Sequence, residues 1–513
     1  MVGPVIVDTS TGKVRGLHKR GVLQFRGIPY ATAERFRPPQ PVEPWSGVRE
    51  ATSFGHICPQ NPSPTEAMLG GQDRPAGEDC LVLNVFTPAA DDAARPVMVW
   101  IHGGAFVSGS GSIVWYDGTQ LARRGVVVVT INYRLGALGF LHLGHLDDEF
   151  AGSGANGIRD QVAALRWVRD NIAAFGGDPD NVTIFGESAG GMSVGTLLGT
   201  PEAAGLFHRA IAQSGAASNV HTPEVAEWVT SRLLAELDLT PAGFDALLEA
   251  PVEDLLRAQA AVTAEVETGA ARDDGPRPGG LPFQPVVDGA VLPRPPLEAV
   301  AAGSAAGIPL VVGTTADEWN LFHLQQRLAG TLTEERVRRR VGRLVGADRA
   351  GDVVDAYRRA LPEADPDGVM CAFMTDLVFR QPAIRLAEAQ AAHAPVAMYR
   401  FDLASTAMGG ALGACHAIDV PFVFDNLDRG GVEILLGGLD DGARALATRT
   451  ADAWVQTART AAPAHDDLEW PAYDTADRLT CVLDRAPRVE ADPEADRRRL
   501  WEELAPAAGA PAP

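Results

Sequence analysis

Residues 181–191 read NVTIFGESAGG, and this stretch decides the expected fold. Its first half is a short run of β-branched and aromatic residues, which is typical of a buried strand. The run leads directly into GESAG at positions 186–190, a match to GxSxG. That pattern is typical of a sharp strand-to-helix turn that lifts a serine hydroxyl above the end of a strand, with glycines where side chains would collide. Ser188 is therefore the candidate nucleophile.

Two other glycine patterns need a different interpretation. GxSxG occurs again at 191–195 (GMSVG), but this copy has no strand of its own before it, so we interpret Ser193 as a structural helix residue. Positions 152–157 (GSGANG) satisfy the GxGxxG pattern of dinucleotide sites. The preceding residues, HLDDEFA, are too acidic for the buried first strand that such a site requires. We expect no dinucleotide site.

Strand-like and helix-like segments alternate along the chain. Four segments have the composition of short buried strands: 96–101, 181–185, 308–312 and 396–401. Residues 160–175 place apolar side chains at helical spacing. The alternation predicts an α/β protein with a mostly parallel sheet covered by helices. We expect helical insertions at about 222–267 and 333–392, and a frayed tail at 505–513.

Composition and charge limit the classes of function. The 513 residues include 46% hydrophobic and 21% charged residues, the balance of an ordinary soluble globular protein. The formal net charge of -22 would repel phosphate backbones and anionic lipid, so neither nucleic acid nor a membrane is an expected partner. Residues 1–12 show no signal peptide and no apolar run is long enough to span a membrane, so we expect the cytoplasm. Five cysteines without a CxxC pair fit neither a disulfide scaffold nor a zinc site.

A glycine-containing loop follows the first of these strands. Residues 100–106 read WIHGGAF, and such a loop can point consecutive backbone N–H groups at one spot. We expect Gly104 and Ala105, with Ala189 from the nucleophile turn, to form an oxyanion hole. Each such donor lowers the barrier of acyl transfer by about 3 kcal/mol.

A serine nucleophile needs a base and an acid that orients the base. His416 lies in the glycine-rich loop TAMGGALGACHA after the strand at 396–401. Glu318 follows the strand at 308–312 and gives the chain order serine, acid, histidine. Asp317 and, less strongly, Asp419 are alternatives, because spacing does not show which carboxylate faces the histidine. All these groups come just after predicted strands, where open α/β sheets place their sites.

Several longer motifs carry a family resemblance. EDCLVLNVF at 78–86 and TIFGESAGG are accompanied, in order along the chain, by FRGIPYA, RFRPPQP, FGGDPDNVT, FHRAIAQSG, GTTADE and DVPFVF. With these motifs the sequence resembles the type-B carboxylesterases, which include para-nitrobenzyl esterases and cholinesterase-like proteins. The resemblance covers about residues 4–501. It implies one α/β-hydrolase domain over residues 1–504, with the helical insertions shaping an active-site gorge.

The resemblance also implies a role for each site residue. It makes Ser188 the nucleophile, Glu318 rather than Asp317 the acid, and His416 the base. The implied oxyanion hole and supporting residues are Gly104, Ala105 and Ala189, with Ser214 and Glu187 next to the triad. No cofactor and no metal are implied.

Two departures from relatives bear on redox state and substrate. In secreted relatives, cysteines matching Cys58 and Cys80 form a disulfide, whereas the expected cytoplasmic location favours reduced thiols. Cholinesterases carry a choline-binding tryptophan in the loop between these cysteines. Residues 59–79 contain no aromatic residue, so choline specificity is not expected.

The predicted reaction is hydrolysis of small to medium hydrophobic esters through an acyl-enzyme. Activity should fall below about pH 6 to 7 if His416 titrates near the normal imidazole value. Amide or carbamate hydrolysis with the same triad is the alternative, and a non-catalytic binding protein on the same fold is a further one. The sequence leaves open whether the protein is a monomer or a small homo-oligomer.

Four aromatic residues lie next to these motifs and are candidates for a substrate pocket: Phe106, Trp115, Trp319 and Phe424. Core packing is an equally good interpretation of aromatic residues at such positions. Cys415 is adjacent to His416 and would make the enzyme sensitive to thiol reagents if it were accessible.

Overall fold

The structure, a computed structural model, describes residues 5–63, 67–68, 74–268, 276–463, 468 and 470–504. The predicted tail at 505–513 lies outside the described residues. Among the helices of the described part, none is both long enough and apolar enough to cross a membrane.

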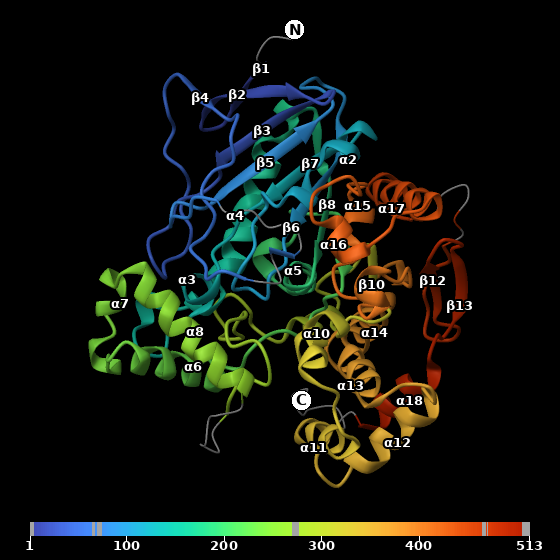
Figure 1. The fold of residues 1–513 in the computed structure, drawn as a ribbon. Helices are drawn as coiled ribbons and strands as arrows, with labels where there is room; N and C mark the ends of the chain where they lie inside the picture. Colours follow the sequence, from blue (N-terminus) through green and yellow to red (C-terminus); the bar gives the residue numbers. More distant parts are fainter. Residues whose placement is uncertain are drawn as a thin grey trace.

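A mixed sheet runs through the molecule (Figure 1). Its strands are β1 (Val5–Thr9), β2 (Gly12–Lys19), β3 (Val22–Pro29), β4 (Val48–Glu50), β5 (Val82–Thr87), β6 (Arg95–Ile101), β7 (Val127–Ile131), β8 (Gly177–Glu187), β9 (Arg209–Gln213), β10 (Leu310–Thr315), β11 (Val396–Phe401), β12 (Leu479–Leu483) and β13 (Arg488–Ala491). The strand order is β1-β2-β3-β5-β7-β6-β8-β9-β10-β11-β12-β13, and β4 pairs with β2. The strands from β7 to β12 in this order are parallel, and the remaining neighbours from β1 to β7 and from β12 to β13 are antiparallel.

The four strands expected from composition are confirmed as β6, β8, β10 and β11. β11 has the predicted bounds, whereas β10 begins two residues later than predicted, at Leu310. Pro309 precedes β10 and has no backbone N–H to donate to a neighbouring strand, which accounts for the later start.

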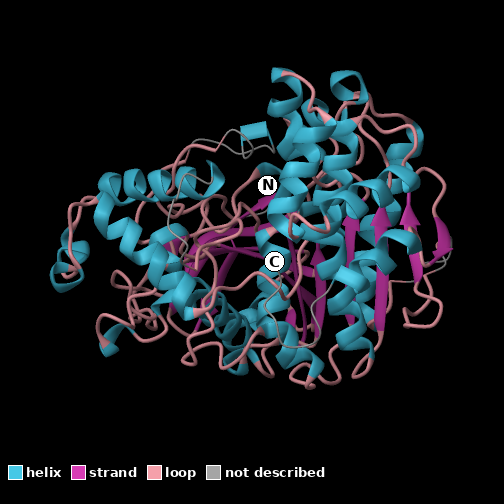
Figure 2. Cartoon of the chain, turned by 90° about the horizontal axis from the view of Figure 1, so that it is seen from below, coloured by secondary structure: helices cyan, strands magenta, loops and turns pink. Residues whose placement is uncertain are grey.

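Helices cover both faces of the sheet (Figure 2). The helices of the described chain, not all of which contact the sheet, are α2 (Thr119–Arg123), α3 (Gly136–Phe140), α4 (Asn156–Asn171), α5 (Ala189–Leu198), α6 (Pro223–Glu236), α7 (Ala246–Glu249), α8 (Val252–Thr268), α9 (Pro296–Ala301), α10 (Asn320–Ala329), α11 (Glu334–Val345), α12 (Ala350–Ala360), α13 (Pro366–Thr375), α14 (Gln381–Ala391), α15 (Val420–Val423), α16 (Val432–Leu436), α17 (Asp441–Thr460) and α18 (Ala495–Leu504). A π-helical turn, η7 (Asp376–Arg380), joins α13 to α14.

The sheet separates two hydrophobic cores. Along β6, Val97 and Val99 belong to the core that includes α4, α5 and α14, whereas Met98 and Trp100 belong to the core that includes α2, α15 and α17. Successive side chains of a strand point to opposite faces, so a strand that is apolar throughout must be covered on both sides. Full burial of one such side chain stabilises the fold by about 1.5–3 kcal/mol.

The two predicted helical blocks differ in how they pack. The first contains α6, α7 and α8, which lie together at one side of the molecule (Figure 1) and contribute to the first core. In the second, α11, α12 and α13 pack with α18 around a third, smaller core that contains Tyr357 and Trp501. α14, also in this block, instead packs against β10 and β11. Helical periodicity shows that a helix has an apolar face, but not whether a helix or a sheet covers it.

A buried ion pair connects α4 to the segment that follows β7. Two nitrogens of Arg134, Nη2 and Nε, donate to the two carboxylate oxygens of Asp160 at 2.7 and 2.8 Å. Both side chains are at most 5% exposed. A bidentate pair at this depth holds the start of α4 in a fixed position relative to the sheet.

Candidate active site

Ser188 lies on the sharp turn between β8 and α5. β8 ends at Glu187 and α5 begins at Ala189, while Ser188 itself has φ 58° and ψ -127°. A non-glycine residue in this region is strained and is found mainly at functional sites. The turn is held by a hydrogen bond from Ser188 N to the carbonyl oxygen of Gln213 at 3.0 Å. A side chain at position 190 would overlap the carbonyl oxygen of Ile101, so only glycine lets α5 approach β6 this closely.

Neither competing glycine pattern lies in the structural context that its motif requires. Ser193 lies buried inside α5 and accepts a hydrogen bond from Gln161 Nε2 at 3.0 Å. The segment before residues 152–157 is a short 3-10 helix at Asp148–Phe150, and no strand precedes the pattern. The helical interpretation of Ser193 is confirmed, and in the described chain a 3-10 helix stands where a dinucleotide fingerprint requires a strand.

The loop after β6 passes directly beside Ser188. A Cβ atom at Gly103 would lie 3.0 Å from the Cβ atom of Ser188, so the two turns are in contact. Gly104 and Ala105 have φ angles of 112° and 55°, and the carbonyl oxygen of Gly104 accepts from Val107 N and Ser108 N. The N–H groups of Gly104 and Ala105 donate to no atom of the described chain. They are therefore available to an oxygen bound beside Ser188.

His416 and Glu318 form a short, buried pair. His416 Nδ1 lies 2.6 Å from Glu318 Oε2, and the two residues are 3% and 0% exposed. The other carboxylate oxygen, Oε1, accepts from Ser214 Oγ at 2.6 Å and from Thr315 N at 2.8 Å. The Glu318 carboxylate accepts a hydrogen bond from Nδ1–H of His416. This bond orients the imidazole ring and fixes the tautomer that has a lone pair on Nε2.

The two alternative carboxylates contact other partners. Asp317 Oδ2 accepts from Ala414 N at 2.9 Å and so fixes the loop that carries His416. Asp419 accepts from Gln213 Nε2 and from the hydroxyl of Tyr399, both at 3.0 Å. Of the three candidates, Glu318 is the one whose side chain is hydrogen-bonded to the imidazole.

Glu187 brings a second carboxylate to His416. Its Oε1 atom lies 3.1 Å from His416 Nε2, and its side chain is 3% exposed. Burial raises the pKa of Glu187 to about 8. Burial lowers the pKa of His416, but the charges of Glu187 and Glu318 and the hydrogen bond to Glu318 outweigh it and raise that pKa to about 9.

These two groups act as a coupled pair. When Glu187 holds the proton, the charge that contributes most to raising the pKa of His416 is absent, and that pKa is lower. The pKa of His416 therefore differs from the normal imidazole value assumed from the sequence, because sequence spacing did not reveal the contact with Glu187.

Aromatic rings that the sequence analysis missed surround His416. The rings of Phe379 and Phe322 lie 4.8 and 5.1 Å from the imidazole, and they are nearly parallel to each other. Phe322 is 43% exposed, so it presents an apolar surface beside the site. Trp319 packs against Phe322 at 5.0 Å. Phe322 could have been found from its position one helical turn after Glu318, but Phe379 reaches the site only through the π-helical turn.

The other three aromatic candidates are packed within the cores. Phe106 is fully buried and packs edge-on against Phe140 at 5.1 Å. Trp115 donates from Nε1 to the carbonyl oxygen of Gly430, and Phe424 packs against Trp100 at 5.0 Å. Core packing, the second interpretation offered by the sequence, describes these three residues.

All five cysteines are buried and free: Cys58, Cys80, Cys371, Cys415 and Cys481. Burial raises the pKa of the Cys415 thiol well above its usual range. A thiol of this kind is inert toward thiol reagents in the folded protein.

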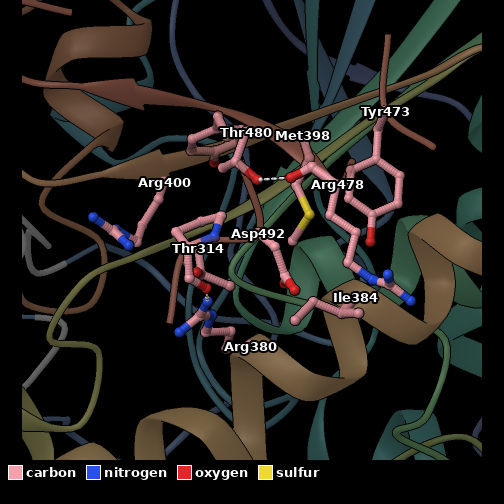
Figure 3. A pocket seen from close by; sticks show the side chains of 11 residues that line it. Thr314, Arg380, Ile384, Met398, Arg400, Tyr473, Arg478, Thr480 and Asp492 are labelled. Carbon is pink, nitrogen blue, oxygen red and sulfur yellow. Dashed lines mark hydrogen bonds between the residues drawn. The ribbon is translucent and has the colours of Figure 1, made fainter. Parts of the chain in front are cut away.

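A separate pocket lies between β10, β11, β12 and α14 (Figure 3). It is bordered by Arg380, Arg400 and Arg478, together with Asp492 and Tyr473. Arg400 is bonded to Asp402 at 2.6 Å and Arg478 to Glu388 at 2.9 Å. The lining includes none of the candidate catalytic residues.

The chain is similar to known proteins over nearly its whole length. Residues 3–501 match the sequence profile of the carboxylesterase family. The chain is 42% identical to the para-nitrobenzyl esterase of Bacillus subtilis (strain 168) over 96% of this chain and 98% of that protein. It is 36% identical to the phenmedipham hydrolase of Pseudarthrobacter oxydans over 94% and 96% of the two chains. The solved structure of the Geobacillus stearothermophilus carboxylesterase EST55 is similar with a TM-score of 0.86 at 44% identity, covering 97% of this chain and 99% of that one. These similarities confirm the predicted α/β-hydrolase fold.

Proposed function

The chain belongs to the carboxylesterase family and is a carboxylic ester hydrolase, and on this premise we propose that Ser188 is its nucleophile, His416 its general base and Glu318 the acid that orients the base. The observation that carries this proposal is the 2.6 Å hydrogen bond between buried Glu318 and His416 beside the strained turn of Ser188. Nucleophile, base and orienting acid are the three parts that an acyl-enzyme mechanism needs.

The reaction starts when His416 Nε2 takes the proton of the Ser188 hydroxyl as Oγ attacks the ester carbonyl carbon. The N–H groups of Gly104, Ala105 and Ala189 donate to the oxyanion that forms. His416 then protonates the leaving alcohol, and the acyl group stays on Oγ. A water molecule, deprotonated by His416, attacks this acyl-enzyme and releases the acid.

Ser214 and Glu187 have supporting roles in this proposal. The hydroxyl of Ser214 holds Oε1 of Glu318, so that the other oxygen stays aligned with the imidazole. Glu187 exchanges a proton with His416 and so sets the pH above which the base is neutral.

We propose small to medium hydrophobic esters as substrates. Phe322 and Phe379 support this, because they place apolar rings next to His416, where the alcohol group leaves, and Trp319 extends this apolar surface by packing against Phe322.

A covalent probe tests the nucleophile. A fluorophosphonate should label the native protein on the peptide that contains Ser188, with loss of esterase activity in proportion to labelling. Ser188→Ala should abolish both labelling and activity. Ser193→Ala is the matched control, since it alters the second GxSxG copy, and it should still be labelled. Labelling of a folded Ser188→Ala protein would contradict the assignment.

The type of bond cleaved is tested with a matched pair of substrates. Turnover of a nitrophenyl acyl ester should exceed that of the anilide with the same acyl group, because an amide needs stronger protonation of its leaving nitrogen. Faster cleavage of the anilide would favour amide hydrolysis by the same residues.

We also propose that the protein acts in the cytoplasm as one domain over residues 1–504. The free, buried state of Cys58 and Cys80 supports a reducing compartment.

A further inference from the structure

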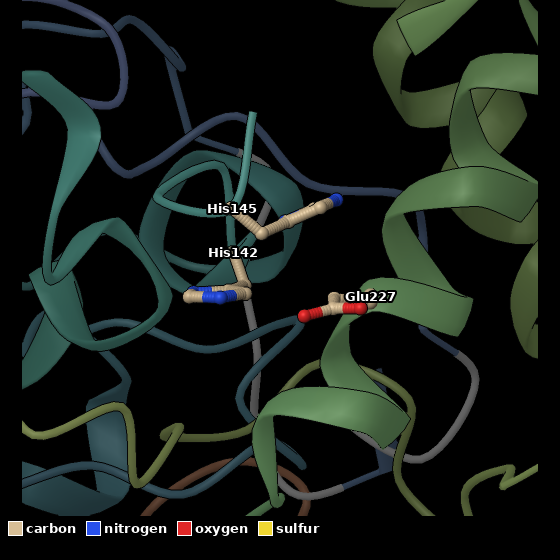
Figure 4. Close-up of side chains that lie close together, drawn as sticks. All are labelled: His142, His145 and Glu227. Atoms are coloured by element: carbon tan, nitrogen blue, oxygen red, sulfur yellow. The ribbon is translucent and has the colours of Figure 1, made fainter. Parts of the chain in front are cut away.

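A group of metal-ligating side chains lies where the first helical block meets the sheet-bound part of the chain. His142 and His145 extend from the loop that follows α3, and Glu227 extends from α6 (Figure 4). One ligand atom from each residue lies within 4.8 Å of the other two. We propose that these three side chains bind one divalent transition-metal ion of the zinc type. Two imidazoles and one carboxylate are a recurrent protein ligand set for zinc.

His142 carries the second observation. Its side chain is 7% exposed, and its Nδ1 atom has no hydrogen-bond partner within the described part of the chain. A buried polar atom without a partner costs free energy. Nδ1 faces Asp288 Oδ2 at 3.7 Å, a distance too long for a hydrogen bond. A metal ion could bind His142 directly at Nδ1 and so give that atom a partner. It could also bind at Nε2, with Nδ1–H donating to Asp288. In this second arrangement a carboxylate orients the metal-bound histidine.

Hydrogen bonds from neighbouring residues hold the backbone around His142 in place, while the side chains of His145 and Glu227 can rotate. The hydroxyl of Thr230 on α6 donates to the carbonyl oxygen of His142 at 2.7 Å, which joins the two elements. Asp288 is held by the N–H groups of Gly152 and Ala290. His145 is exposed and Glu227 only partly buried. Ligands of a tetrahedral zinc ion lie about 3.4 Å apart, so rotation of these two side chains closes the remaining gap.

The protonation state suits a metal ion. An imidazole with an ordinary pKa is mostly neutral at pH 7 and offers a lone pair to a metal ion. Imidazole must be unprotonated to ligate a metal. A bound cation would also be favoured by the net charge of -22.

Metal binding at this place would cross-link α6 to the loop after α3. α3 itself supports the oxyanion loop, since Gly136 N donates to the carbonyl oxygen of Phe106 and Phe140 packs against the Phe106 ring. We therefore expect the ion to raise the thermal stability of the protein, because it binds only the folded state.

The test uses the full-length protein after dialysis against a chelator. Zinc chloride is titrated by calorimetry, and Co²⁺ is used as a spectroscopic probe because four-coordinate Co²⁺ has strong visible absorption. The native protein should bind one equivalent of Zn²⁺, give the four-coordinate Co²⁺ spectrum and gain thermal stability. His145→Ala and Glu227→Gln should each weaken binding at least about tenfold. His142 is left unchanged, because its replacement would disturb buried packing.

Two control variants match these changes. His18→Ala removes an exposed histidine on β2, and Glu224→Gln alters an exposed glutamate one turn earlier on α6. Both should bind Zn²⁺ as the native protein does. Absence of binding, or equal affinity in His145→Ala and the native protein, would overturn the proposal. Binding that is lost in His416→Ala would place the ion in the active site and would overturn it as well.

Discussion

Replacing Glu187 by glutamine should shift the pH dependence of the esterase toward lower pH. The variant keeps the shape of the side chain and removes the carboxylate 3.1 Å from His416 Nε2. In the native protein the pKa of His416 rises from 6.5 to about 9, and the charge of Glu187 is the largest of the effects that raise it. We therefore expect the variant to lower this pKa by about one unit or more.

The sign of the effect follows from the protonation state that catalysis needs. His416 must be neutral to accept the Ser188 proton, so kcat/KM falls as the pH drops through the pKa of the coupled Glu187–His416 pair. If the pKa is one unit lower, the fraction of neutral imidazole is about tenfold larger at any pH well below both pKa values. For each protein, kcat/KM at about pH 6 is divided by the maximum that kcat/KM reaches at high pH. This fraction should be about tenfold larger for the variant than for the native protein.

The measurement is a profile of kcat/KM for a nitrophenyl ester from about pH 5 to about pH 9, followed at the isosbestic wavelength of the product. Glu202→Gln is the matched control, because Glu202 pairs with Arg166 on the surface and should leave the profile unchanged. An acid limb that stays in place in Glu187→Gln, or moves to higher pH, would refute the coupling between these two groups.

Three further changes test the support of the site, the fold and the substrate surface. Ser214→Ala removes one hydrogen bond to the Glu318 side chain, worth about 1.5 kcal/mol, and should lower kcat about tenfold at unchanged KM in steady-state kinetics. Asp160→Asn leaves Arg134 charged and buried, and should lower the free energy of unfolding in urea by about 3–5 kcal/mol. Phe322→Ala removes an exposed ring beside His416, and should raise KM for aromatic esters about threefold to tenfold while KM for acetate esters of small alcohols changes little.

Each of these expectations has a result that would contradict it. An unchanged kcat in Ser214→Ala would mean that Thr315 N alone holds Glu318. A loss below about 1 kcal/mol in Asp160→Asn would mean that water reaches the buried guanidinium. Equal changes of KM for both ester types in Phe322→Ala would exclude a direct contact with the aromatic group.

The sequence predicted those parts of the fold that local patterns determine. Strands appear as short β-branched runs, and the strained turn at Ser188 requires glycine on both sides, so both leave a signal in neighbouring residues. The placement of Glu318 and His416 after two different strands could be predicted because parallel strands present their carboxyl ends at one edge.

The remaining features depend on contacts between distant segments. Glu187 is adjacent to Ser188 in the chain, yet its effect on His416 arises only when β8 and the loop after β11 meet. Phe379 contacts His416 because a π-helical turn changes the direction of its side chain, and no sequence pattern considered above marks such a turn. Phe424 is the last residue of the motif DVPFVF, and its ring packs in the core, since proximity in sequence does not determine which face of the sheet a side chain covers.

The division of the interior by the sheet has a consequence for mutational tolerance. Val99 and Trp100 are neighbours in β6, but their side chains belong to separate cores on opposite faces. Substitutions on the two faces share few contacts, so their effects on stability should add. A change in the packing of α2, α15 and α17 should therefore leave the apolar contacts of α5 on the opposite face unchanged.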